Sequence, residues 1–162
     1  MKTNINHELV VQALKNGTVI DHIPSDKLFQ VVSILALHTM PNQITIGNNL
    51  ESKKLGIKGI IKISDVFFTP KEVNKIALIA PNAKINIIKN YEVIKKVELV
   101  IPDEIKDTLQ CINPMCITNK EHVPTHFYFI DKKKRLAKCH YCERICKDED
   151  LIFELFEILL IP

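Results

Sequence analysis

Polar and apolar residues alternate over short stretches in the first 100 positions, and a helical period interrupts this alternation twice. Residues 18–23 (TVIDHI) alternate and are rich in β-branched side chains, which predicts a strand that Pro24 ends. Over residues 26–38 the apolar side chains recur every three or four positions, which predicts a helix that Ser25 can cap. A strand followed by an amphipathic helix is therefore expected at the start of the chain.

The order of the remaining elements indicates a fold. The segment TPKE at residues 69–72 combines a capping box with proline at the first helical position, and Pro81 stops the helix expected over residues 70–80. Further strands are expected at residues 44–50, 58–63, 84–89 and 91–97. This order, β-α-β-β-α-β with one extra strand, predicts an α+β unit over residues 1–100: a ferredoxin-like antiparallel sheet with two helices.

Four cysteines beyond that unit are spaced like metal ligands. Cys111 and Cys116 form a C-x4-C pair, and Cys139 and Cys142 form a C-x2-C pair after a gap of 22 residues. Two such pairs can bring four thiolates into the tetrahedral geometry of a structural Zn²⁺, which leaves no coordination site for a substrate. Two disulfides or four buried thiols are the alternatives. Disulfides are disfavoured because the first residues, MKTNINHELV, lack the apolar segment of a secretion signal, and a cytoplasmic location is expected.

The cysteines belong to a second, smaller unit. Residues 100–103 (VIPD) are expected to be a linker, and residues 104–162 to form a small all-β zinc domain. An aromatic strand at residues 127–130 and a charged turn at residues 131–135 lead towards the second cysteine pair. Residues 150–162 combine an acidic stripe with an apolar face, which predicts an amphipathic helix that packs on the zinc domain.

The charge is small but unevenly distributed. A formal net charge of +3 does not by itself indicate a nucleic-acid-binding protein. Residues 1–103 hold 13 lysines against 9 acidic residues, an excess that suits a small anionic ligand. The basic residues 132–135 favour a solvated turn over a nucleic-acid contact. Nucleic acid is therefore not expected as a partner. A membrane is not expected either, because no apolar run approaches the 18 residues of a membrane span.

The N-terminal lysines suggest what the ligand could be. No nucleophile–base pair and no phosphate-binding glycine loop is visible, so catalysis is not expected. Asp21 and His22 are neighbours in a strand, and such neighbours are expected to point to opposite faces. Lys58 and Lys62 are an even number apart and can share one face, and with Lys96 they could hold phosphates while Asp21 accepts from ribose hydroxyls. The alternative is a lysine-rich, solvated sheet edge.

Five sequence features stand in order along the chain: GTVIDHIP at residues 17–24, ITIGNNL at 44–50, IIKI at 60–63, NYEV at 90–93, and the cysteine pattern. Together they resemble the regulatory chains of aspartate carbamoyltransferase over roughly residues 9–149. The resemblance implies a non-catalytic regulatory subunit in pyrimidine biosynthesis, with CTP and ATP as effectors and one structural Zn²⁺ per chain. It also implies a homodimer of regulatory chains that binds the aspartate carbamoyltransferase catalytic chain.

The same resemblance assigns site residues position by position. The base and ribose side would be lined by Val11, Ala13, Leu14, Ile60 and Lys62. The base pocket would be closed by Asn86, Ile88, Tyr91 and Val93. Ribose hydroxyls and phosphates would be met by Asp21, His22 and Lys96, with Lys58 at a nearby basic position. The zinc ligands would be Cys111, Cys116, Cys139 and Cys142, and the catalytic chain would face Asn113, Glu143 and Arg144.

The chain departs from the pattern at Glu8, where the best-known member of the family has a lysine that reaches nucleotide phosphates. A second nucleotide, or a metal-assisted pair of nucleotides, is therefore not expected to bind in the familiar way. The rival hypothesis for the whole chain is a nucleic-acid-binding zinc-ribbon protein that uses the basic residues 132–135.

Overall fold

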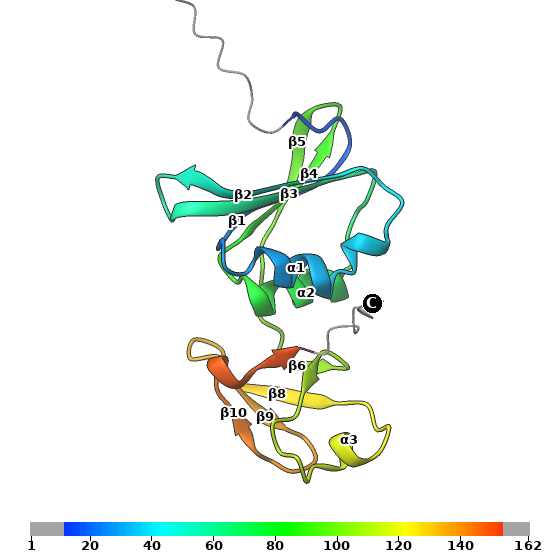
Figure 1. Ribbon diagram of the computed structural model, residues 1–162, viewed down its shortest axis with the longest axis vertical. Helices are drawn as coiled ribbons and strands as arrows, with labels where there is room; N and C mark the ends of the chain where they lie inside the picture. Colours follow the sequence, from blue (N-terminus) through cyan, green and yellow to red (C-terminus); the bar gives the residue numbers. More distant parts are fainter. Residues whose placement is uncertain (1–11, 154–162) are drawn as a thin grey trace, which may run out of the picture.

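The computed structural model describes residues 12–153, which form two units arranged one above the other (Figure 1). The upper unit is a sheet with helices beneath it, and the lower unit is smaller and built mostly from short strands (Figure 1). Glu8, Val11 and the part of the predicted tail helix beyond Phe153 lie outside the described residues.

The larger unit is built on a five-stranded antiparallel sheet whose strands lie in the order β2-β3-β1-β4-β5. Its strands are β1 (Gly17–Ile23), β2 (Ile44–Ser52), β3 (Gly56–Ser64), β4 (Lys84–Lys89) and β5 (Glu92–Val97). These confirm the five predicted strands. Strand β5 begins one residue later than predicted because Asn90 and Tyr91 form the turn after β4, with φ of 51° and 66°.

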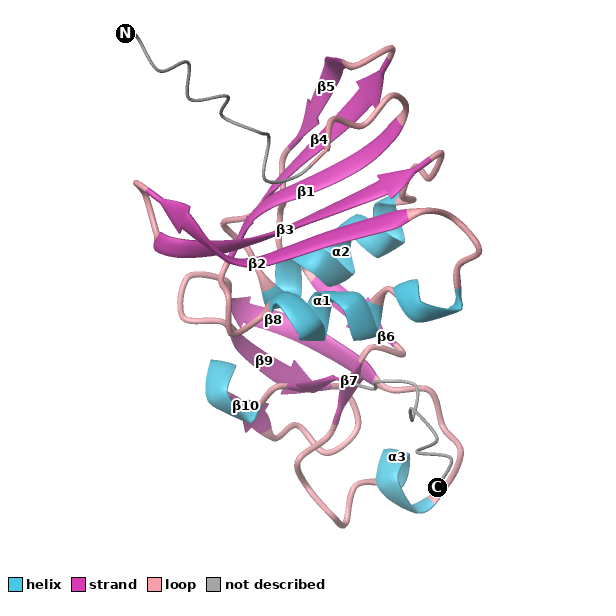
Figure 2. Ribbon diagram, turned by 45° about the horizontal axis from the view of Figure 1, so that its top comes forward, coloured by secondary structure: helices cyan, strands magenta, loops and turns pink. Residues whose placement is uncertain are grey.

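Within residues 12–153, helices cover one face of this sheet and leave the other free of helices (Figure 2). They are α1 (Leu28–Ile34), the short 3-10 helix η1 (Leu37–Thr39) and α2 (Pro70–Ile79). The predicted capping box of α2 is confirmed: the Thr69 N–H donates to Glu72 Oε2 at 2.8 Å, and the Glu72 N–H donates to Thr69 Oγ1 at 3.4 Å. Helix α2 is therefore fixed at its start by its own first turn.

The first helix is shorter than predicted, and its predicted cap is wrong. Lys27 occupies the cap position and makes no side-chain cap bond, while Ser25 Oγ has no hydrogen-bond partner among the described residues. Ala36 adopts a left-handed conformation, with φ of 50°, that ends the first helix and separates it from η1. The apolar period over residues 26–38 therefore belongs to two short helices, because it reports which side chains are buried and not where the backbone turns.

The core of the larger unit lies between the sheet and the helices. Ile20, Ile61 and Ile85 are fully or almost fully buried and come from three adjacent strands. Gly59 lets α1 approach the sheet, because a Cβ at this position would lie 2.7 Å from the Leu28 side chain. Residues that alternate with these isoleucines point to the opposite face, which no described helix covers (Figure 2).

The smaller unit has a four-stranded sheet in the order β10-β9-β8-β6 and a separate pair, β7 with β11. Its strands are β6 (Glu104–Lys106), β7 (Leu109–Gln110), β8 (His126–Asp131), β9 (Leu136–Cys139), β10 (Ile145–Cys146) and β11 (Ile152–Phe153). Single turns α3 (Ile117–Lys120) and η2 (Asp148–Asp150) complete it. The predicted tail helix is wrong at residues 152–153, because β11 pairs there with β7.

The two units pack against each other through a shared interface. Leu78 on α2 is fully buried in the hydrophobic cluster of the smaller unit, and Phe153 packs against both clusters. The Arg135 guanidinium donates a hydrogen bond to the Leu78 carbonyl, and its Nε lies 2.9 Å from Asp148 Oδ1. The turn at residues 132–135 is therefore not wholly solvated as predicted: the Arg135 side chain is only 15% exposed.

Candidate metal centre and ligand-binding face

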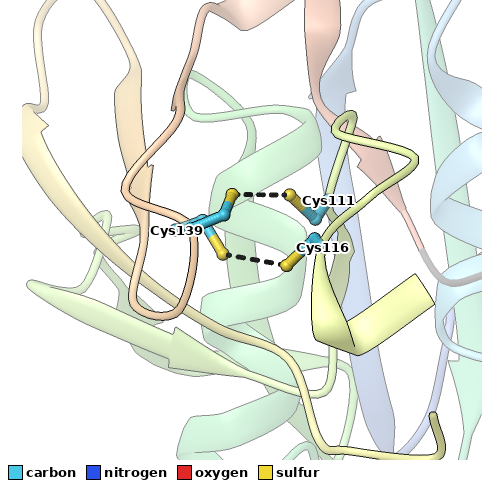
Figure 3. Close-up of side chains that lie close together, drawn as sticks. Cys111, Cys116 and Cys139 are labelled. Carbon is cyan, nitrogen blue, oxygen red and sulfur yellow. Dashed lines mark hydrogen bonds between the residues drawn. The ribbon is translucent and has the colours of Figure 1, made fainter. Parts of the chain in front are cut away.

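The four predicted metal ligands meet in the smaller unit. Figure 3 shows the side chains of Cys111, Cys116 and Cys139 converging on one centre. The Sγ atoms of Cys111 and Cys142 lie 3.6 Å apart, those of Cys116 and Cys139 lie 3.8 Å apart, and all four are within 4.8 Å of one another. A tetrahedral site with Zn–S bonds of about 2.3 Å has S–S edges of about 3.8 Å, whereas a disulfide needs about 2.05 Å. The geometry therefore fits a four-thiolate metal centre.

Local hydrogen bonds shape the two cysteine loops. The Asn113 carbonyl accepts from the Cys116 N–H at 2.9 Å, and its side-chain oxygen accepts from the Met115 N–H at 3.1 Å. In the second loop the Glu143 N–H donates to the Cys139 carbonyl at 3.0 Å, with Glu143 at φ of 58°. Such tight turns aim both thiols of a pair to the same side.

The thiols differ in how readily they ionise. Burial raises the pKa of Cys111 and of Cys139. Burial would also raise the pKa of Cys142, but hydrogen bonds from the Arg144 N–H and the Asn113 side chain lower it to about 7. Cys142 is therefore more ready than Cys111 or Cys139 to bind a cation at neutral pH, and those two buried thiols would lose their protons as the cation arrives.

A row of side chains crosses the helix-free face of the larger sheet. Cross-strand pairing places Thr45 beside Lys62, Lys62 beside Val19, Val19 beside Asn86, and Asn86 beside Lys96. The row runs through all five strands, β2-β3-β1-β4-β5. With strands about 4.8 Å apart, Lys62 and Lys96 are separated by three steps, or about 14 Å. An extended anionic ligand that lies across the sheet can contact both lysines.

Asp21 and His22 lie beside this row, at an irregularity in β1. The pairing of β1 with β3 shifts between Ile20 and Ile23, and His22 adopts φ of 57°. This bulge brings the adjacent side chains together, with His22 Nδ1 3.3 Å from Asp21 Oδ2. The prediction that they point to opposite faces is therefore wrong, because the bulge breaks the alternation on which it depended.

Lysines flank the Asp21 carboxylate. Lys58 Nζ lies 2.8 Å from Asp21 Oδ1. This contact agrees with the expectation that Lys58 lies on the same face of the sheet as Lys62, which pairs with Val19 two residues before Asp21. Burial alone would raise the pKa of Asp21, but Lys58 and the His22 N–H bind the carboxylate and lower its pKa overall. Burial also lowers the pKa of Lys62, which the Asp21 charge partly opposes. An ionised carboxylate thus lies among cationic groups, in position to accept hydrogen bonds.

Two cavities divide most of the predicted nucleotide site between them. The larger, of about 620 Å³, is lined by predicted residues Asp21, His22, Asn86, Val93 and Lys96. The smaller, of about 210 Å³, is lined by predicted residues Ala13, Leu14, Lys62 and Tyr91. Lys58, Ile60 and Ile88 line neither of these two cavities, although Lys58 holds Asp21.

The chain before β1 closes the smaller cavity. Lys62 Nζ donates to the Gln12 carbonyl at 2.6 Å, and the Tyr91 N–H donates to the Lys15 carbonyl at 2.9 Å. The β4–β5 turn therefore carries the exposed Tyr91 ring to the side of the row where Lys62 lies.

The three predicted partner-contact residues gather on the cysteine loops. Asn113 and the Arg144 N–H both bond to Cys142, and Glu143 follows Cys142 directly. Glu143 and Arg144 are exposed and Asn113 is half-buried.

In residues 12–153 no helix is long and apolar enough to span a bilayer.

Lys84 and Glu98 were missed by the sequence reasoning, although both line the larger cavity. Lys84 lies opposite Asp21 in the register of β1 and β4, a pairing between residues 63 positions apart. The sequence offered one indication: Lys84 and Asn86 are two residues apart in a strand and therefore share a face. That spacing could be interpreted only once the structure showed which face of β4 carries Asn86.

Two family models match the chain over almost all of the residues described. Residues 9–100 match the aspartate carbamoyltransferase regulatory chain, allosteric domain, and residues 103–152 match the metal binding domain of the same chain.

Individual relatives agree with these matches. The aspartate carbamoyltransferase regulatory chain of Bacteroides fragilis is 59% identical over 143 residues, which cover 88% of this chain and 94% of the relative. That of Parabacteroides distasonis is 52% identical and covers 95% of this chain and 100% of the relative. That of Pyrococcus horikoshii is 47% identical and covers 91% of this chain and 99% of the relative. The similarity thus extends across both units.

Proposed function

The chain belongs to the family of aspartate carbamoyltransferase regulatory chains, and on that premise we propose that it binds CTP and ATP on the helix-free face of its larger sheet. It is a regulatory and not a catalytic chain. The nucleotide would change how its catalytic partner binds substrate, and so adjust pyrimidine biosynthesis to nucleotide levels.

The row from Lys62 to Lys96 is the observation that carries the nucleotide proposal. The smaller cavity offers the Tyr91 ring and backbone groups of residues 12–15, which suit a base and ribose. The larger cavity offers Lys96 and His22 for phosphates and the ionised Asp21 for hydroxyl groups. A triphosphate nucleotide can therefore lie along the row, with its base near Lys62 and its phosphates near Lys96.

The metal centre supports a second proposal, in which one Zn²⁺ per chain holds the surface that binds the catalytic chain. Four thiolates with edges near 3.8 Å suit Zn²⁺, and a filled tetrahedral sphere is structural. Large apolar side chains are exposed on or beside the cysteine loops: Met115 is 74% exposed, Ile145 is 50% and Tyr141 is 41%. Exposed apolar groups beside Asn113, Glu143 and Arg144 suit a protein–protein contact.

The finer features of the fold and assembly belong to the same proposal. The order β2-β3-β1-β4 with two helices on one face supports a ferredoxin-like unit in residues 1–100. Residues 104–162 would be the zinc domain. The chain would form a homodimer of regulatory chains and act in the cytoplasm, and family membership is the support for both.

Calorimetric titration of the full-length, zinc-loaded chain with CTP tests the nucleotide proposal. Lys62→Gln and Lys96→Gln should each weaken CTP binding about tenfold, because each removes a charge-assisted hydrogen bond. Lys95→Gln removes the same charge from a β5 residue that lines neither cavity, and should bind CTP like the wild type.

Two results would contradict the proposal. One is a Lys62/Lys96 double variant that binds CTP as the wild type does. The other is binding that ignores the base and falls steeply with salt, which is the behaviour of a protein that binds nucleic-acid phosphates.

A further inference from the structure

We infer that Lys84 is a second phosphate-binding lysine of the larger cavity, beside Lys96, and that it makes this cavity select nucleotides with a chain of phosphates over nucleotides with one. The inference rests on the nucleotide proposal above. It concerns a residue that neither its local sequence nor the row from Lys62 to Lys96 identifies.

The fold fixes Lys84 at the cavity wall. It is the first residue of β4, and its neighbours Ala83 and Ile85 are 7% and 1% exposed. The Ala83 N–H donates to the Ala80 carbonyl at 3.0 Å, which ties this segment to the end of α2. Buried neighbours on both sides hold the backbone while the Lys84 side chain remains exposed at the cavity.

Register places Lys84 close to Lys96. Asn86 pairs with Lys96 and Ile85 pairs with Val97, so Lys84 lies diagonally across from Lys96 on the same face. The Cα atoms of diagonal neighbours of this kind are about 7–8 Å apart. Two lysine side chains that start this close on one face can reach successive phosphates of one polyphosphate chain.

The charges around the cavity leave both lysines available. Lys84 pairs in register with Asp21, but the Asp21 carboxylate is bound by Lys58 Nζ at 2.8 Å. Neither Lys84 nor Lys96 forms an ion pair or hydrogen bond with any side chain in the described part of the chain. Glu98 is the other carboxylate that lines the cavity, and its charge disfavours an anion that only one lysine binds.

The cavity therefore favours a ligand that brings several negative charges. A nucleoside triphosphate can contact Lys84 and Lys96 together and outweigh the repulsion from Glu98. A nucleoside monophosphate brings a single phosphate group and therefore gains less from the second lysine. The ratio of triphosphate to monophosphate affinity is thus the property that Lys84 sets.

The test is calorimetric titration of the full-length, zinc-loaded chain with CTP and with CMP. Lys84→Gln should weaken CTP binding about tenfold and leave CMP binding within about twofold, so that the affinity ratio falls. Lys84→Arg keeps the charge and should keep the ratio. Lys95→Gln is the control for an equal loss of charge outside the cavity, and thermal unfolding should show that each variant is folded.

The possible outcomes separate this inference from the proposal beneath it. If the ratio of CTP affinity to CMP affinity in Lys84→Gln equals that of the wild type, or that of Lys95→Gln, the proposed role of Lys84 is wrong while the nucleotide proposal stands. A wild-type chain that binds neither CTP nor CMP would overturn the nucleotide proposal and this inference together. Loss of CTP and CMP binding by the same factor would assign Lys84 to the base or ribose and not to the phosphates.

Discussion

At the scale of single residues, the sulfur atoms of the metal centre are not equivalent. Cys142 has a pKa lowered to about 7, whereas burial raises the pKa of Cys111 and Cys139. Cys146 is fully buried close by in β10, but it is not one of the four clustered ligands. The chain thus provides its own control for a cysteine substitution.

Cys142→Ser should lower Zn²⁺ affinity by about 100-fold or more, because it removes one thiolate from a saturated site. Cys146→Ser should leave the affinity unchanged. Competition with a chromophoric chelator measures both variants. Wild-type affinity and stoichiometry in Cys142→Ser would exclude it as a ligand.

Asp21 provides a prediction on pH. Its pKa is lowered from an ordinary value of 3.8, so the carboxylate contributes its full stabilisation at about pH 5 and above. That stability is lost as the pH falls below 3.8 and through the still lower pKa of the folded state. Asp21→Asn should cost about 1 kcal/mol at neutral pH, through loss of the Lys58 ion pair.

Denaturant unfolding of the wild type and of Asp21→Asn between pH 7 and pH 3 measures the difference between their free energies of unfolding. This difference should stay constant from pH 7 to about pH 5 and shrink towards pH 3. A difference that grows as the solution becomes more acidic would show that the Asp21 pKa is raised in the folded chain.

At the scale of elements, local signals predicted most of the fold, and long-range contacts decided what those signals missed. The capping box of α2 lies within four consecutive residues, and strand alternation needs only a few, so both could be read from the sequence. The bulge at Asp21 and His22 depends on how β1 pairs with β3, about 40 residues away. No local pattern encodes that pairing, and the same holds for Lys84 opposite Asp21.

Arg135, at the interface between the two units, is another residue whose long-range contact the local sequence does not predict. In sequence it ends a run of basic residues typical of a solvated turn, and in the structure it donates to the Leu78 carbonyl near the end of α2. A cation at the C-terminal end of a helix is also favoured by the helix dipole. Arg135 therefore connects the smaller unit to the helix that leads into β4 and the larger cavity.

Arg135→Gln should destabilise the chain by about 1–3 kcal/mol, because the Leu78 carbonyl and Asp148 lose a charged partner. Lys133→Gln, in the same turn and exposed, should change the free energy of unfolding by less than about 0.5 kcal/mol. Denaturant unfolding at neutral pH compares them. Equal stability of the two variants would mean that the Arg135 contact does not hold the units together.

At the scale of the whole molecule, the cavity and the metal centre lie in different units joined through α2 and the segment before β6. The walls of the larger cavity include Pro81, Asn82 and Ala83, which follow α2 directly. The same helix places Leu78 in the core of the metal-binding unit. A nucleotide that shifts the end of α2 would therefore act on the unit proposed to hold the catalytic chain.

The most direct test is the CTP affinity of the chain assembled with its own catalytic chain, measured with and without a bisubstrate analogue of the carbamoyl transfer. Regulation through linkage predicts that the analogue changes CTP affinity by about 5–150-fold, and that CTP changes the affinity for the analogue by the same factor. Identical CTP affinities in the two states, with substrate binding indifferent to CTP, would contradict a regulatory role for nucleotide on this sheet.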